Sequence, residues 1–250
     1  ADAEAFKQAD IALFAVNTEI SQALAPQAVE NKCTVIDNSY AFRLDDRVPL
    51  VVPEVNPNDI DWHQGIIANP NCSTIIMAVA IYPTHLAAGL KRVIVSTYQA
   101  VSGAGILGLK ELEDHVRAWA AGEAKKPQVF QHPIAFNVIP HIDTFMDEGY
   151  TREELKMVWE TRKIMHAPDL KISATTVRVP VFRSHSESIT LELDKDLTPL
   201  QVREILSQAP GVVVQDDPSR NIYPMPLYTS NTDEVYVGRI RRDISGERGI

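Results

Sequence analysis

The chain has 250 residues, 45% of them hydrophobic and 23% charged, and a formal net charge of −9. This is the composition of a globular protein with one large or two modest domains, and the acidic balance argues against nucleic acid or anionic membrane as partners. No apolar run reaches the roughly 20 residues of a membrane-spanning helix, and two cysteines are too few for a disulfide framework. We therefore expect a cytoplasmic protein.

Short apolar runs alternate with helical patterns in the first third of the chain. Strands are predicted at 11–16, which we expect to be buried, and at 34–37, 50–52 and 66–68; helices are predicted at 21–29 and 73–86. Strands that alternate with helices or loops favour a parallel sheet of doubly wound type. The sequence thus predicts an α/β fold for this part.

The remaining chain has a different pattern. Strands are predicted at 92–100, 172–181, 186–193, 211–214 and 234–241, and a helix at 107–121 is followed by a long loop region at 124–143. Capping boxes at Thr151–Glu154 and Thr198–Gln201 mark two further helix starts, the first of a helix that ends at 164. We expect an α+β domain with a mixed sheet and helices on one face.

Cys72 lies in the stretch Asn69-Pro70-Asn71-Cys72-Ser73-Thr74, between a turn and a predicted helix. The unpaired N–H groups and positive dipole end of a helix start favour a thiolate and lower the thiol pKa from about 8.5. The alternative is a small buried hydrophobe, which is how most cysteines outside disulfides behave. Cys33, in "ENKCTVID", fits that alternative.

A reactive thiol needs a base, and His185 is the most suggestive of seven histidines. It follows a predicted strand and lies near Arg178. Two residues seven apart in an unbroken strand face opposite sides, so a bend at Pro180 and Arg183-Ser184 is needed to turn both into one cleft. The alternative is a surface or structural histidine.

Two further patterns have competing interpretations. Glu160 and Lys163 share one face of a predicted helix, which also fits a surface ion pair of little energetic value. The run 103–108 is literally G-x-G-x-x-G, yet no strand with a terminal acidic residue follows about 20 positions later. We interpret it as a glycine-rich turn that brings backbone close to a ligand.

Eight motifs together resemble the aspartate-semialdehyde dehydrogenase family over nearly the whole chain. They are "DNSYAFR", "VPLVVPEVN", "NPNCSTI", "QAVSGAG", "FNVIPHID", "EELKMVWETRKI", "RVPVFRSHSES" and "VYVGRIRRD". The resemblance implies reductive dephosphorylation of 4-phospho-L-aspartate to L-aspartate 4-semialdehyde with NADPH, through a cysteine thioester, in amino-acid biosynthesis. It also implies a homodimer or a dimer of dimers, and no metal.

The resemblance assigns a role to each matching residue. The nucleophile is Cys72, the acid/base that exchanges protons with the thiol and the hemiacetal oxygen is His185, and Gln99 positions the intermediate. Arg178 would bind the substrate carboxylate, Glu160 its ammonium, Arg43 and Lys163 the phosphate, and Asn38, Ser102 and Gly103 the cofactor. We expect Cys72, Gln99, Arg178 and His185 to meet in one cleft. Residues 1–71 would be the remainder of an NADP-binding Rossmann-like domain, and 72–250 the catalytic and dimerisation domain.

Other functions remain open at this stage. An N-acetyl-glutamyl-phosphate reductase has related chemistry but usually a Gly-Cys-Tyr context at its cysteine. A cysteine hydrolase would not need the phosphate-binding Arg and Lys. A third possibility is a truncated, non-catalytic dimerisation module that kept the fold.

The two cysteines should differ in reactivity. We expect iodoacetamide to alkylate Cys72 quickly near neutral pH and Cys33 slowly, because only Cys72 lies at a predicted helix start. Peptide mass spectrometry over time gives both rates, and equal rates would contradict the assignment.

A second expectation concerns the family's N-terminal glycine-rich pyrophosphate loop and its C-terminal helix, which have no match in these 250 residues. We expect the isolated chain to show no NADPH oxidation with 4-phospho-L-aspartate. Steady loss of NADPH absorbance with the purified chain would contradict this, and would favour 103–108 as the dinucleotide motif.

Overall fold

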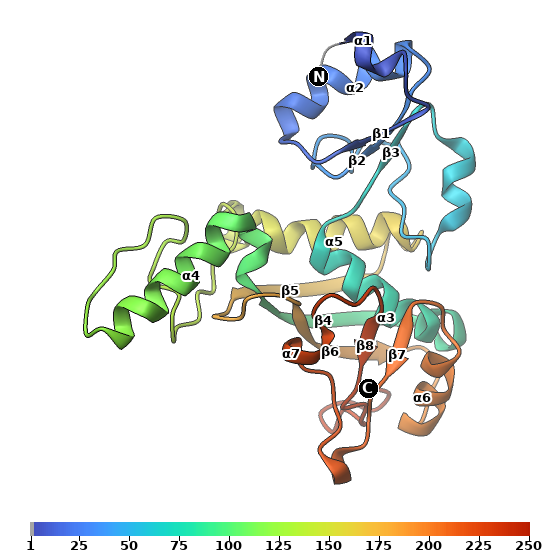
Figure 1. Cartoon of the computed structure of the whole chain (residues 1–250). Helices are drawn as coiled ribbons and strands as arrows, with labels where there is room; N and C mark the ends of the chain where they lie inside the picture. Colours follow the sequence, from blue (N-terminus) through green and yellow to red (C-terminus); the bar gives the residue numbers. More distant parts are fainter. Residues whose placement is uncertain (1–2) are drawn as a thin grey trace. The chain divides into compact units, whose positions relative to one another are not determined.

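The structure is a computed structural model that describes residues 3–250 (Figure 1). The chain forms two compact units. Among the described residues, the first unit comprises 3–79 and 159–169, and the second comprises 80–158 and 170–250. Helices α3 (Cys72–Ala88) and α5 (Arg152–Ile164) each contribute residues to both units.

The first unit contains a three-stranded sheet in which all neighbours are parallel, as the sequence predicts. The strands of this sheet are β1 (Ile11–Phe14), β2 (Thr34–Asp37) and β3 (Ile66–Ala68). The unit also contains α1 (Ala3–Phe6), α2 (Thr18–Glu30) and the 3₁₀ helix Pro57–Trp62. Helix α2 begins after Asn17, whose side chain accepts a hydrogen bond from the N–H of Ile20. It packs on the sheet through a core that includes Phe14, Ala25 and Cys33.

Two predictions for this unit are wrong in detail. Residues 50–52 form no strand, because only an isolated bridge joins Leu50 to Ala68. The run from Ile11 is not buried throughout, since Ile11 and Leu13 are 59% and 76% exposed. Successive side chains of a strand point to opposite faces, and only the face of β1 that carries Phe14 packs into the core.

The second unit contains the predicted mixed sheet, of order β5-β4-β6 (Figure 1). Strand β4 runs parallel to β5 and antiparallel to β6. The unit comprises β4 (Leu90–Gln99), α4 (Gly105–Ala120), β5 (Lys171–Arg178), β6 (Ser186–Leu193), α6 (Pro199–Ser207), β7 (Val212–Val214), α7 (Pro226–Thr229), β8 (Val235–Val237) and 3₁₀ helices at Val101–Ala104, Asp147–Gly149 and Pro218–Arg220. Strands β7 and β8 pair in parallel as a separate two-stranded sheet.

Strand β4 shows clear alternation. Val93, Val95 and Thr97 are buried on one face, whereas Ile94 and Tyr98 are 42% and 46% exposed on the other. The period of two follows from the pleat of a strand. The mixed sheet of the second unit therefore has a buried face and an open face.

The first turn of α5 is fixed to this sheet. Glu154 accepts the N–H of Thr151 while the Thr151 hydroxyl accepts the N–H of Glu154, so the predicted capping box is confirmed. The other oxygen of Glu154 accepts the N–H of Thr176 on β5 at 2.9 Å. The capping box at Thr198 and Gln201 is confirmed as well.

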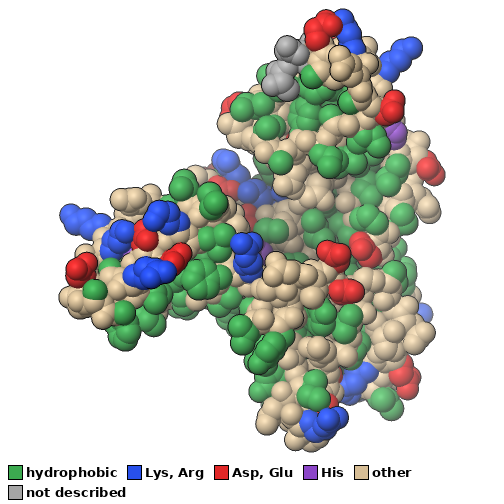
Figure 2. All heavy atoms as spheres, viewed as in Figure 1, with side chains coloured by type: hydrophobic (Ala, Val, Ile, Leu, Met, Phe, Trp, Pro, Cys, Tyr) green, Lys and Arg blue, Asp and Glu red, His purple; other side chains and the backbone are tan. Residues whose placement is uncertain are grey.

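The predicted long loop at 124–143 forms no helix or strand, and one carboxylate anchors it to α4. Glu111 is buried and accepts the N–H groups of Gln128, Val129 and Phe130. The surface over α4 carries charges of both signs (Figure 2). One ion pair of this helix joins Arg117 to Glu113. Among residues 3–250, no helix is both long enough and apolar enough to cross a membrane.

Candidate active site

Cys72 is the first residue of α3, as the sequence predicts. The side-chain oxygen of Asn71 accepts the N–H groups of Ser73 at 3.0 Å and Thr74 at 3.1 Å, which makes Asn71 the cap of this helix. Cys72 is exposed, whereas Cys33 is buried in the core of the first unit. The thiol of Cys72 is thus presented at the positive end of a capped helix, where the dipole favours its thiolate form.

A buried carboxylate holds the turn before Cys72. Glu160 is fully buried on α5, and its two oxygens accept the N–H of Asn71 at 2.6 Å and Nη1 of Arg43 at 3.2 Å. A carboxylate without such partners would be costly to bury. The alternative of a surface ion pair between Glu160 and Lys163 is therefore wrong.

Lys163 is bound to a different segment. Its ammonium donates to the backbone carbonyls of Arg43, Asp45 and Val48 at 3.0, 2.7 and 2.9 Å. Burial lowers the pKa of Lys163, against the opposing effect of nearby carboxylates. Lys163 therefore orders the loop that begins at Arg43.

Asn38 lies where parallel strands end. It follows β2, is exposed, and its side-chain oxygen accepts Nδ2 of Asn69, which follows β3, at 2.7 Å. Ligands of doubly wound sheets bind outside the carboxyl ends of the strands. An exposed amide pair at this edge fits the polar groups of a nicotinamide nucleotide.

In the second unit, Gln99 and Arg178 end neighbouring strands and are register partners. Both are buried. The peptide group of Ala100 connects Arg178 with His185. Its carbonyl accepts a hydrogen bond from Nη1 of Arg178 at 2.7 Å, and its N–H donates one to Nδ1 of His185 at 2.9 Å.

The chain turns between Arg178 and His185, where Ser184 has a φ of 70°. A Cβ atom on Gly103 would lie 2.8 Å from Nη1 of Arg178 and 3.2 Å from Cε1 of His185. The predicted bend is thus confirmed, and Arg178, His185 and Gly103 meet. The N–H of Ser102 donates to the carbonyl of Phe182 in the same turn.

The surroundings of His185 keep its ring neutral. Burial, and then the charge of Arg178, lower its pKa to about 4, while Glu153 opposes the shift. The imidazole of His185 therefore carries no charge near neutral pH.

Two residues that sequence reasoning missed support these side chains. The amide nitrogen of Gln99 donates to Glu153 at 3.1 Å, and the ring of Phe130 lies 5.8 Å from the Arg178 guanidinium. The sequence signal that could have indicated Glu153 is its position in the first turn of the helix that the capping box at Thr151 predicts. Phe130 lies in an irregular loop and gave none.

The ten predicted site residues divide between the two units. Asn38, Arg43, Cys72, Glu160 and Lys163 belong to the first, and Gln99, Ser102, Gly103, Arg178 and His185 to the second. That Cys72 joins Gln99, Arg178 and His185 stays a prediction. No group of three or more His, Cys, Asp or Glu within residues 3–250 is suited to hold a metal ion.

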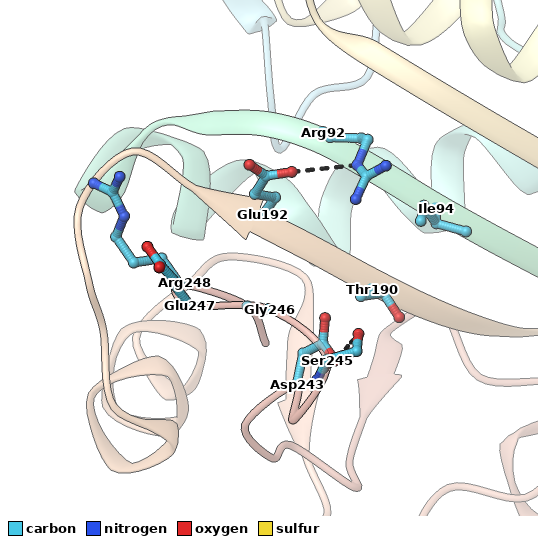
Figure 3. A pocket seen from close by; sticks show the side chains of 10 residues that line it. Arg92, Ile94, Thr190, Glu192, Asp243, Ser245, Gly246, Glu247 and Arg248 are labelled. Atoms are coloured by element: carbon cyan, nitrogen blue, oxygen red, sulfur yellow. Dashed lines mark hydrogen bonds and ion pairs between the residues drawn. The ribbon is translucent and has the colours of Figure 1, made fainter.

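A cavity of about 470 Å³ occupies the open face of the mixed sheet (Figure 3). The sheet contributes the ion pair of Arg92 and Glu192 to its lining, and the other side is formed by residues 243–249. None of the predicted site residues lines it.

Comparisons with known proteins agree with the motifs. Residues 81–250 match the model "Semialdehyde dehydrogenase, dimerisation domain" and residues 1–63 match "Semialdehyde dehydrogenase, NAD binding domain". The chain is 55% identical to the aspartate-semialdehyde dehydrogenase of Aquifex aeolicus over 98% of the chain and 73% of that protein, and 51% identical to that of Bacillus subtilis over 100% and 75%. The crystal structure of aspartate semialdehyde dehydrogenase II from Vibrio cholerae complexed with ASA has 44% identity and a TM-score of 0.95, covering 98% of this chain and 73% of that one. The chain belongs to the aspartate-semialdehyde dehydrogenase family.

Proposed function

We propose that the chain carries the acyl-transfer site of an enzyme that reduces 4-phospho-L-aspartate to L-aspartate 4-semialdehyde with NADPH. The observation that supports this most directly is the exposed Cys72 at the start of α3, capped by Asn71. A thiolate there attacks the acyl phosphate, phosphate leaves, and a thioester forms. Reduction of the thioester and loss of the thiolate release the aldehyde.

Charged groups of the site would bind the two ends of the substrate. Arg178 binds the α-carboxylate, because the forked donors of a guanidinium match the two oxygens of a carboxylate. Glu160 binds the ammonium. Gln99, whose amide is held by Glu153, positions the acyl group. These assignments carry the family's roles to matching residues.

The phosphate would bind to the positive charge of Arg43 and Lys163. Arg43 donates from Nη1 to Glu160, and its buried Nε has no hydrogen-bond partner among the described residues. An ammonium that binds Glu160 would release Nη1 of Arg43 for the phosphate. Lys163 would keep the loop of Arg43 in place through its three carbonyl contacts.

A nicotinamide cofactor, when bound, supplies the hydride that reduces the thioester. Asn38, Ser102 and Gly103 would hold its nicotinamide end, and we propose NADP as the form used. The exposed position of Asn38 at the carboxyl edge of its sheet supports this role.

We also propose that the protein is a homodimer that pairs through the open face of the mixed sheet. Ile94 and Tyr98 leave apolar surface exposed there, next to small polar side chains such as Ser96 and Thr175. The family model that matches this region is named a dimerisation domain.

Acyl transfer is tested by trapping the thioester. When the chain is incubated with 4-phospho-L-aspartate and quenched in acid, we expect an aspartyl adduct on Cys72. Cys33→Ser should keep the adduct, because Cys33 is buried, and Cys72→Ser should lose it. Mass spectrometry of the intact chain and its peptides gives the result. An adduct on Cys33, or none on either cysteine, would contradict the proposal.

The dimer is tested by sedimentation velocity. A charge at position 98 would be buried against the second copy, so Tyr98→Asp should convert a dimer into monomers. Leu200→Asp is the matched control, because Leu200 is 62% exposed on α6, outside the proposed face. Dimers that survive Tyr98→Asp, or an unchanged chain that sediments as a monomer, would refute this interface.

A further inference from the structure

Arg178 is held through both its backbone and its guanidinium, by residues of the second unit. Its N–H and C=O exchange two hydrogen bonds of 2.9 Å with Ile139, and Nη1 donates to the carbonyl of Ala100 at 2.7 Å. The guanidinium carbon lies over the ring of Phe130, 5.8 Å from the ring centroid. Ile139 and Phe130 both belong to the long loop at 124–143. This loop therefore holds Arg178 at its backbone and at its charged end.

The ring of Phe130 holds the guanidinium without using its hydrogen-bond donors. The face of an aromatic ring is the negative part of its quadrupole and attracts a cation within about 6 Å of the centroid. Arg178 is only 7% exposed, so water weakens this attraction little. A ring occupies no N–H group that a bound carboxylate would need. The contact therefore suits an arginine that has to stay in place and still bind an anion.

Packing against α4 fixes the ring of Phe130 in turn. The ring lies against the core cluster that includes Leu112 of α4 and Ile134 of the long loop. Gly108 of α4 faces the far end of the ring, because a Cβ atom there would lie 3.2 Å from Cζ of Phe130. The absence of a side chain at Gly108 thus leaves the space that the ring occupies. The position of the ring is set by α4 as much as by the loop.

A buried carboxylate of α4 fixes the backbone at Phe130. Glu111 is 7% exposed, and its two oxygens accept the N–H groups of three successive residues, Gln128, Val129 and Phe130. These N–H groups have no strand or helix to pair with, since the segment is irregular, and a buried N–H without an acceptor is costly. Glu111 therefore determines where the loop segment that carries Phe130 lies on α4.

We propose that Phe130 is a positioning residue for the guanidinium of Arg178, and that Glu111 is the residue that places Phe130. The inference rests on the proposed function, in which Arg178 binds the α-carboxylate of the substrate, and deepens it. A guanidinium that is already held loses less conformational entropy when a carboxylate binds. A contact of this kind acts equally on the bound substrate and on the transition state, so its loss raises KM and leaves kcat nearly unchanged.

Nitrogen NMR of labelled arginine tests the contact without any substrate. We expect the Nε–H signal of Arg178, assigned by its loss in Arg178→Lys, to move in Phe130→Leu, because the ring current of Phe130 is then absent. Glu111→Gln replaces one acceptor oxygen by an NH2 group and should move the signal as well. Glu113→Gln is the matched control on the same helix, because Glu113 is exposed and pairs with Arg117. A signal that stays in place in Phe130→Leu would overturn the proposal.

The effect on substrate binding is measured by the concentration dependence of Cys72 acylation. With 4-phospho-L-aspartate, Phe130→Leu should raise the half-saturating concentration about tenfold and leave the rate at saturation nearly unchanged. Pentafluorophenylalanine incorporated at position 130 alone keeps a ring of similar shape but removes the negative charge from its face, so it should act as Leu does. A half-saturating concentration that fluorination leaves unchanged would show that Phe130 acts by packing alone. Glu113→Gln should keep the original value.

A second substrate separates this proposal from a general loss of structure. β-Alanyl phosphate lacks the α-carboxylate, so its half-saturating concentration should be the same in the unchanged chain and in Phe130→Leu. An equal loss with both substrates would overturn the role of Phe130, and circular dichroism shows whether the variant is folded. If the unchanged chain shows no adduct at Cys72, the proposed function fails, while the NMR signal of Arg178 still decides whether Phe130 positions the guanidinium.

Discussion

The buried carboxylate of Glu160 is the constraint on which the geometry around Cys72, the proposed nucleophile, depends. One oxygen binds the N–H of Asn71 and the other binds Arg43. The turn before Cys72 and the loop of the proposed phosphate site are thereby tied to one side chain of α5. Removing it would leave a buried guanidinium and a buried N–H without this acceptor, at a cost of several kcal/mol by the usual values for buried ion pairs. In the proposed binding mode, a substrate ammonium at Glu160 would therefore compete with a contact that also shapes the site.

Sequence reasoning was most reliable where local chemistry decides the structure. The capping box at Thr151, the helix start at Cys72 and the individual strands of the mixed sheet follow from patterns within a few residues. The contact between Asn71 and Glu160 spans 89 residues, and the one between Ala100 and His185 spans 85. No periodicity or motif encodes such contacts. The family resemblance supplied the residues, but not the partners that hold them.

The pattern G-x-G-x-x-G at 103–108 shows how a motif can have a different physical origin. A side chain at Gly103 would collide with Arg178, and one at Gly108 would lie 2.5 Å from the carbonyl oxygen of Val101. These glycines are needed because the backbone passes close to the proposed carboxylate-binding arginine and to its own 3₁₀ turn. Their spacing therefore needs no pyrophosphate to explain it, in agreement with the missing acidic strand end.

Charge and hydrogen bonding contribute differently to the protonation state of His185. The cation of Arg178 helps to keep the ring neutral, but a substrate carboxylate on Arg178 would offset that charge at the moment of reaction. The N–H of Ala100 has no charge to offset, and its direction is set by the end of β4. Of the two effects, only the backbone bond is independent of the ligand. The backbone bond therefore keeps the His185 ring in one orientation while the charges around it change, because a preorganised dipole needs no rearrangement.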